Sequence, residues 1–316
     1  MSGGPLRARW LLLPVAAALL LGASAAAQTA PAERCVLIRE AYVYLNPDTG
    51  STKVAMVERG REVAILAKSH QWVQVFAMTP QRQVSGWMLD KGIVRPTDPQ
   101  GDRIVFGEAA DSEAEASRPQ GRKDAAQDAL RLYYRVAEYF PNSPLAAEAA
   151  YRSADIRWQV DKHDVMTRAS AHAQKPGDRG QVDEDAMRDV IKKFPHTPQA
   201  DLATYALIDN KLCGDWLAQA VCPEREAGIY EKYAAEHPQS PKAAEAIYNA
   251  AWRQAALIDI YHTAEEPKKL EEARAKALAL CQRVTTQYPQ SEWTLRATRL
   301  AYLVQQGIAV YGSGVE

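Results

Sequence analysis

The sequence has almost no net charge and no cluster of basic residues. Its 38 lysines and arginines nearly balance 39 aspartates and glutamates, so the formal net charge is −1. Without a basic patch, a protein has little with which to neutralise the phosphates of nucleic acid. We therefore expect no nucleic-acid partner. The 316 residues, 47% hydrophobic and 24% charged, are otherwise typical of a folded chain with two or three domains.

The sequence also lacks the motifs by which many catalytic sites are recognised. It contains no CxxC pair, no Walker loop, no GxGxxG fingerprint and no serine nucleophile motif. His163, Asp164 and His172 do not share the spacing of one helix face, so they do not indicate a metal site. We predict a protein that is not an enzyme and has no cofactor and no metal.

Cysteine is scarce, with four residues in the chain. Cys213 and Cys222 bracket the short segment CGDWLAQAVC and are the favoured disulfide pair of an exported protein. Cys35 and Cys281 lie far apart in the sequence. They are either paired or free, because four cysteines allow three connectivities.

The one long apolar run of the sequence lies at its N-terminus. Arg7 and Arg9 precede the run from Trp10 to Leu21, and a stretch of small residues follows it. This order is that of a secretory signal peptide, and the run is shorter than the roughly 20 apolar residues that cross a bilayer. We predict a signal peptide over residues 1–27, cleaved near Ala27, with an uncleaved signal anchor as the alternative. The mature chain is then exported, periplasmic or associated with a bacterial cell envelope, and has no transmembrane segment.

Residues 33–96 alternate apolar and polar side chains with the period of two that is typical of β-strands. Turn sequences such as Asn-Pro-Asp-Thr-Gly and Arg-Gly-Arg separate the runs. Five or six short strands within this stretch must hide their edges, which predicts a small closed barrel.

Six short segments follow one another in this stretch: Val43-Tyr44-Leu45-Asn46, Lys53-Val54, Arg59-Gly60, Val63-Ala64-Ile65-Leu66, Trp72-Val73-Gln74-Val75 and Gly86-Trp87-Met88. Their order resembles the bacterial SH3-like domain, over residues 35–96. The sequence departs from the family at Pro47-Asp48, where the family usually continues with a short strand. The resemblance implies a domain that binds a peptide or peptidoglycan.

Four aromatic residues of this domain are candidates for ligand binding. Trp72 and Trp87 either form an aromatic wall for an extended peptide or fill the core of the barrel. We favour the core, because aromatic residues dominate the energetics of small cores. Tyr42 and Tyr44 alternate with Val43, so they lie on the opposite face and are better candidates for an exposed surface.

Residues 97–123 change in character. They are rich in acidic side chains and alanine, and apart from Ile104-Val105-Phe106 they offer little to bury. This composition predicts a flexible or partly helical linker between two domains.

Beyond residue 124 one phrase recurs four times. Relative to its first proline, an aromatic residue or His stands one position before, Ser or Thr two after, Ala eight after, and Tyr, Met or Cys eight before. Proline ends a helix, Ser or Thr caps the next one, and Ala lets two helices approach closely. The phrase therefore predicts the turn of a helical hairpin, and hairpins that each hide one face must stack. The four phrases are 140–151, 194–205, 237–248 and 288–299.

Two of these phrases, Phe-Pro-Asn-Ser-Pro and His-Pro-Gln-Ser-Pro, are followed by alanine-rich sequence. Residues 124–311 thereby resemble tetratricopeptide-type repeats, in particular those of the periplasmic Tol–Pal coordinator and outer-membrane assembly lipoprotein families. Their spacing is longer than the regular period of about 34 residues, with the extra residues in 161–184, 213–226 and 262–269. The resemblance implies a repeat domain over residues 124–312 that holds a protein or peptide partner. Trp216, inside the Cys213–Cys222 loop, is the candidate partner-facing residue.

These features predict a multidomain protein, with a small all-β SH3-like barrel followed by an all-α tetratricopeptide-like solenoid of helical hairpins. We expect an exported, non-catalytic scaffold or adaptor of the cell envelope. Its repeats would bind a protein or peptide, and its barrel a peptide or peptidoglycan. The alternatives are a cell-wall hydrolase with an unrecognised active site and a soluble subunit of an outer-membrane assembly machine.

Overall fold

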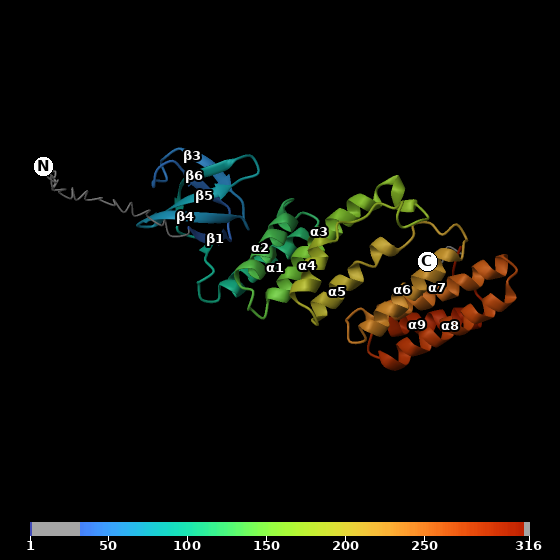
Figure 1. Ribbon diagram of the computed structural model, residues 1–316. Coiled ribbons are helices and arrows are strands. Elements are labelled where there is room, and N and C mark those ends of the chain that lie inside the picture. The colour runs from blue at the N-terminus through green and yellow to red at the C-terminus, as the bar shows by residue number, and fades with distance from the viewer. Residues whose placement is uncertain (2–31, 313–316) are drawn as a thin grey trace. The chain divides into compact units, whose positions relative to one another are not determined.

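A computed structural model describes residue 1 and residues 32–312, so the predicted signal peptide and its cleavage site lie outside the described residues, apart from Met1. Within residues 32–312, an all-β segment of seven strands precedes nine α-helices (Figure 1). This confirms the predicted order of β and α segments. In this range no helix combines the length and the apolar character needed to cross a bilayer.

The strands form one antiparallel sheet in the order β3-β2-β6-β5-β4-β1-β7. Strands β3 and β7 stand at the two ends of this order, so in the described part of the chain no ladder of hydrogen bonds closes the sheet into the expected barrel. The strands are β1 (Glu33–Leu37), β2 (Ala41–Tyr44), β3 (Lys53–Val57), β4 (Glu62–Ser69), β5 (Trp72–Met78), β6 (Gln83–Leu89) and β7 (Ile93–Val94).

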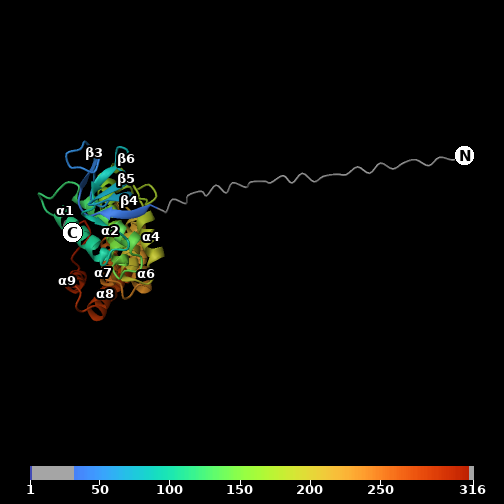
Figure 2. The same ribbon diagram turned by 90° about the vertical axis from the view of Figure 1, so that its left-hand side faces the viewer.

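One face of the sheet carries a hydrophobic core. Along β5, buried Val73, Val75 and Ala77 alternate with residues of the other face, as the period of two predicts. Each strand from β1 to β6 contributes buried residues to this one cluster, and the sheet curls around it (Figures 1 and 2). Shifts of register within the β2–β3 and β4–β5 pairs supply local bends.

The helices follow in chain order. They are α1 (Gly101–Ala116), α2 (Ala125–Tyr139), α3 (Ala146–Met166), α4 (Asp185–Lys193), α5 (Pro198–Ala206), α6 (Val221–Glu236), α7 (Ala243–Thr263), α8 (Pro267–Gln287) and α9 (Trp293–Gln305), with short 3-10 helices at Ala169–His172 and Asp209–Lys211. Consecutive helices pack against each other from α1 to α5 and again from α6 to α9.

The four repeated phrases adopt one common turn. The residue before each proline ends α2, α4, α6 or α8 with φ between −126° and −130° and ψ between 52° and 57°. The alanine eight positions after each proline is 0% exposed, and the residue eight before is at most 6% exposed. The predicted hairpins are therefore present, as α2–α3, α4–α5, α6–α7 and α8–α9. The residues that end the first helices are Phe140, Phe194, His237 and Tyr288.

The predicted Ser or Thr helix cap is present in one of the four repeated phrases. Thr197 Oγ1 accepts a hydrogen bond of 3.2 Å from the N–H of Ala200 and caps α5, with Pro198 at its first position. The serine of each other phrase instead accepts from the N–H two residues later, and its carbonyl oxygen accepts from the N–H three residues later. This extra turn delays the start of the helix. The three serines are Ser143, Ser240 and Ser291.

Residues 97–123 were predicted to be a flexible or partly helical linker, and α1 occupies Gly101–Ala116 of them. This helix is packed into a core with β1, β7 and α2 and is not a flexible connection. Val105, Ala109 and Ser112 are buried at the spacing i, i+4, i+7, which makes one helical stripe. The stripe consists of small side chains among acidic ones, so its apolar character is weak in the sequence.

Helices α1 and α2 are joined to the sheet by a shared core. Val36 of β1 and Val94 of β7 belong to the same buried cluster as Val105 and Leu132. The turn between β3 and β4 approaches α2 so closely that a Cβ on Gly60 would lie 2.6 Å from the Cβ of Arg131, and Gly60 has a left-handed φ of +75°. The sheet and the helices therefore fold as one compact unit.

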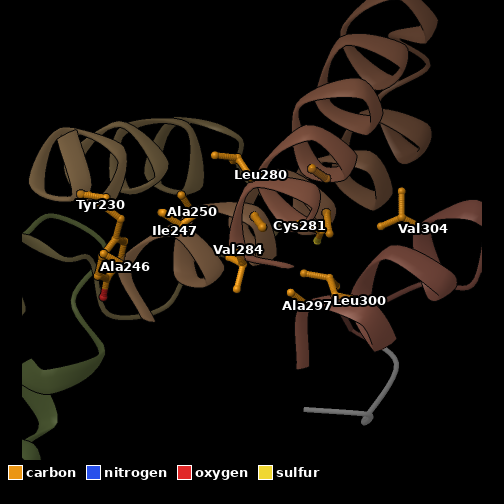
Figure 3. Packing of buried hydrophobic residues seen from close by; sticks show 14 of the residues in the cluster. Tyr230, Ala246, Ile247, Ala250, Leu280, Cys281, Val284, Ala297, Leu300 and Val304 are labelled. Carbon is orange, nitrogen blue, oxygen red and sulfur yellow. The ribbon is translucent and has the colours of Figure 1, made fainter. Parts of the chain in front are cut away.

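The largest buried cluster is formed mainly by α6 to α9. Tyrosine and alanine side chains of α6 and α7 meet leucine, valine and cysteine side chains of α8 and α9, as Figure 3 shows. The cluster includes Tyr230, Ala246, Ile247, Ala250, Leu280, Cys281, Val284, Ala297, Leu300 and Val304.

The packing of α1 predicts unequal effects at two adjacent residues. Val105→Ala should lower the free energy of unfolding by about 2 kcal/mol, because Val105 is fully buried and its truncation leaves a cavity. Ile104→Ala is the matched control: Ile104 is 43% exposed, so its loss should cost less than about 0.5 kcal/mol. Urea unfolding of both variants measures this. Equal, small effects would mean that residues 97–123 behave as a linker after all.

Candidate functional site

A polar cleft of about 350 Å³ lies between α3 and α5 on one side and α6 and α7 on the other. It is lined by aromatic, amide and charged side chains from these four helices and from the segment after α5. Because residues distant in the sequence converge on it, this cleft is the strongest candidate for a binding site in the described part of the chain.

Helix α3 supplies one wall of the cleft. Tyr151, Asp155, Trp158, Gln159 and Lys162 recur at i, i+4, i+7, i+8 and i+11, which places them on one helix face. Trp158 is only 2% exposed, so its indole forms part of the floor. The other lining residues of α3 are less buried and bring their polar groups to the opening.

Tyr205 of α5 is held by the facing helices. Its hydroxyl oxygen accepts a hydrogen bond of 2.9 Å from Asn249 Nδ2, and its ring centroid lies 6.1 Å from that of Tyr230. Lys242 Nζ lies 5.5 Å from the centroid of the Tyr205 ring and forms a salt bridge of 2.6 Å with Glu245. The phenol is therefore fixed in place before any ligand arrives.

Burial keeps the tyrosines of the cleft neutral. It raises the pKa of Tyr151 and of Tyr205 above the ordinary value, and it raises the pKa of Tyr230 to about 12. A neutral phenol can both donate and accept hydrogen bonds. The cleft thus offers fixed aromatic faces and hydroxyl groups to a polar ligand.

Asp155 differs from the other charged residues of the cleft. Lys162 pairs with Asp209, and Lys242 pairs with Glu245. Within residues 32–312 Asp155 has no ion-pair partner, and its carboxylate accepts one side-chain hydrogen bond, of 3.1 Å, from Gln159 Nε2. Burial raises the pKa of the Asp155 carboxyl above its ordinary value.

The four aromatic candidates of the β segment lie together on the outer face of the sheet. The Tyr44 ring meets the rings of Tyr42 and Trp72 edge to face, with centroids 6.5 Å and 5.6 Å apart. Tyr44 also stands opposite Trp87 in the pairing of β2 with β6. The structure therefore brings together Tyr42, Tyr44, Trp72 and Trp87.

The favoured interpretation that Trp72 and Trp87 fill the core does not hold for Trp87, whereas Trp72 is buried but lies outside the inner-face cluster. Neither belongs to the core cluster of the inner face, whose members in β5 and β6 include Val73 and Met88. Trp72 is 6% exposed, because Tyr44 covers it on the outer face, and Trp87 is half-buried. Adjacent residues of a strand point to opposite faces, so inward Val73 and Met88 force both tryptophans outward.

Beside the four predicted candidates, the outer face presents the exposed apolar side chains of Met56, Phe76 and Met78. Tyr42 and its β3 partner Met56 are each 44% exposed, and Lys53 Nζ lies 4.0 Å from the centroid of the Tyr42 ring. Phe76 and Met78 continue this face along β5. In the sequence of β5, both side chains alternate with the buried Val75 and Ala77, and this alternation could have predicted their exposure.

The predicted disulfide between Cys213 and Cys222 is confirmed. Trp216, inside the loop that this bond closes, stacks on Tyr311 and lies against Trp252, with centroids 5.5 Å and 5.3 Å away. These contacts occupy much of the indole that was predicted to face a partner.

A buried carboxylate holds the disulfide loop in place. Glu226, 1% exposed, accepts hydrogen bonds from Cys213 N–H at 2.8 Å and from Trp216 Nε1 at 3.3 Å. Arg253 Nε pairs with the same carboxylate at 3.0 Å. The loop is therefore fastened to α6 and α7.

The other two cysteines are free and buried. Burial raises the pKa of the Cys35 and Cys281 thiols to about 12, so neither is a thiolate at neutral pH. Cys35 Sγ contacts the carbonyl oxygen of Val63, and Cys281 lies in the core of α6 to α9. Both serve as small core residues.

Comparisons with known proteins do not identify a family for this chain. No family model matches the sequence, and no curated protein matches it significantly. Among solved structures, a chain described as "DHF58 filament" is 16% identical and aligns over 65% of this chain and 91% of that chain, with a TM-score of 0.24. A TM-score of this size carries no argument about fold or function.

The pKa of Asp155 predicts how Asp155→Asn changes stability with pH. The folded protein binds the Asp155 proton more tightly than the unfolded chain, whose carboxyl has a pKa of about 3.9. Wild-type stability from this group is therefore complete below about pH 3.9 and is lost as the pH rises through the folded-state pKa. An asparagine at this position does not ionise, so the variant keeps the same stability there at both pH values. The melting temperature of the variant minus that of the wild type should therefore be higher at pH 7 than at pH 3.5. Thermal unfolding at both pH values measures this difference, and an equal or reversed difference would contradict it.

Proposed function

We propose that the protein is an exported, non-catalytic scaffold of the bacterial cell envelope that binds an extended segment of a partner protein in the cleft between its helical hairpins. The observation that carries the proposal is the convergence of four helices on one open cleft with fixed aromatic rings and hydrogen-bonding groups. Stacked helical hairpins commonly use such surfaces to hold peptides. The repeated turns and buried alanines support a tetratricopeptide-like array, as the sequence resemblance implies.

The disulfide supports the proposal that the protein works outside the cytoplasm. Cys213–Cys222 closes an ordered loop, and disulfides persist in oxidising compartments. Together with the predicted signal peptide, this favours a periplasmic protein.

The outer face of the sheet is the second proposed contact, for a peptide or for peptidoglycan. Tyr42, Tyr44 and Trp87 form an aromatic surface beside the edge strand β3, and Lys53 adds a cation. Aromatic faces pack well on extended peptides and on the apolar faces of sugars. The sheet then adds a cell-wall contact to the partner contact of the helices, which is the arrangement of a scaffold.

Photo-crosslinking in intact bacterial cells tests the cleft. A photo-crosslinking amino acid at Gln159, whose side chain lines the cleft, should give a defined crosslinked protein after irradiation. The same amino acid at Val160, the next residue of α3, should not, because Val160 is 53% exposed and does not line the cleft. Immunoblotting and mass spectrometry of the products read out the difference. Equal yields at both positions, or a lytic band from the purified protein in a sacculus zymogram, would overturn the proposal.

Cosedimentation with purified sacculi tests the outer face of the sheet. Trp87→Ala and Tyr42→Ala should each weaken binding about tenfold, because aromatic side chains often dominate the energetics of an interface. Leu66→Ala is the control, since Leu66 is 53% exposed but lies outside the aromatic group. If both aromatic variants sediment like the control, the sheet does not bind the cell wall through this face.

A further inference from the structure

The charged side chains that line the cleft indicate which class of peptide it binds. Three carboxylates and two lysines line the cleft, and both lysines are paired with carboxylates within it. The charge that remains is the carboxylate of Asp155. An acidic ligand would meet this carboxylate and find both lysines already engaged.

Asp155 is positioned to receive a cation. It lies half-buried in the middle of α3, and Gln159 satisfies one of its two oxygens. A buried carboxylate that lacks an ion-pair partner is costly to the fold. A cation supplied by a ligand would offset that cost, whereas no stacking contact of the helices requires a charge at this position.

Aromatic rings flank the same carboxylate. Tyr151 and Trp158 stand one helical turn before and after Asp155 on the same face of α3, and Tyr205 lines the cleft from α5. Rings of this kind attract ammonium and guanidinium groups. Lys242 already lies over the Tyr205 ring, which shows that a ring of this cleft accepts a cation.

We propose that the cleft binds a lysine or arginine side chain of the partner segment, with Asp155 as the counter-ion, the rings of Tyr151 and Tyr205 beside the aliphatic stem, and Trp158 in the floor beneath it. This inference depends on the proposed function and specifies its ligand: a basic residue within an extended polypeptide. Gln159, as the hydrogen-bond donor to Asp155 Oδ1, is a positioning residue that leaves Oδ2 for the ligand.

Synthetic peptides test the inference without knowledge of the natural partner. Each probe is an extended Gly-Ser peptide with one central residue: arginine, lysine, citrulline as the neutral isostere of arginine, or glutamate. Titration is followed by the ¹⁵N-indole NMR signal of Trp158, assigned with a Trp158→Phe variant. The arginine or the lysine peptide should shift this signal with an affinity about tenfold higher than that of the citrulline peptide. The glutamate peptide should bind most weakly.

Two protein variants complete the experiment. Asp155→Asn should reduce the affinity for the basic peptide about tenfold. The affinity should then equal that of the wild-type protein for the citrulline peptide. Asp164→Asn should leave binding unchanged, because Asp164 is exposed on the same helix and does not line the cleft. The exchange of arginine for citrulline alters the ligand alone, so it remains decisive if a variant folds poorly.

The outcomes separate this inference from the proposed function. Equal shifts with all four peptides would overturn the preference for a basic side chain while leaving a peptide-binding cleft intact. No shift of Trp158 with any peptide at millimolar concentration would also overturn the inference. The crosslinking contrast between positions 159 and 160 would then decide the proposed function by itself.

Discussion

The helical part of the protein depends on one repeated arrangement, in which a buried alanine of one helix lies in the same cluster as a larger buried residue of the helix before it. Ala149 shares a buried cluster with Tyr133, and Ala203 shares one with Met187. Within α6 to α9 the same roles fall to Ala246 with Tyr230 and to Ala297 with Cys281. Alanine permits close approach of two helix axes, and the preceding turn, with nearly the same φ and ψ each time, aims the second helix back along the first. Each pair covers one face alone, so the pairs must stack.

The cleft arises where this regular stacking is interrupted. Helix α5 has 9 residues, whereas α3 and α7 have 21 each, so the second hairpin is too short to cover its neighbours. The extra residues that lengthen the repeat spacing fill part of this gap. Gly214 N–H donates to the carbonyl oxygen of Ala173, and His172 faces Asp215, so the first insertion packs against the disulfide loop. The short second hairpin and the insertions around it thus account both for the irregular repeat spacing and for the cleft.

Local rules were enough for the features that depend on neighbours in sequence. The hairpin turns follow from proline and from the Ser or Thr after it, and the Cys213–Cys222 bond follows from a short loop. The packing of α1 was not predicted, because its buried stripe of Val105, Ala109 and Ser112 consists of small side chains and one of them is polar. The two tryptophans were assigned to the core because aromatic residues dominate small cores, but Val73 and Met88 take the inward face of their strands. The cleft required the packing of helices far apart in sequence, which no local pattern contains.

The placement of Asp155 indicates a constraint other than folding. The contacts that stack the hairpins are apolar, and the buried charges elsewhere in the helices are paired, as Glu226 is with Arg253 and Asp128 with Arg131. A neutral residue at position 155 would satisfy the same packing without the cost of a half-buried, unpaired carboxylate. Natural sequences depart from consistent stabilisation chiefly where a site must remain ready for a ligand. The cleft is therefore best understood as a binding surface in which a partner supplies the cation that pairs with Asp155.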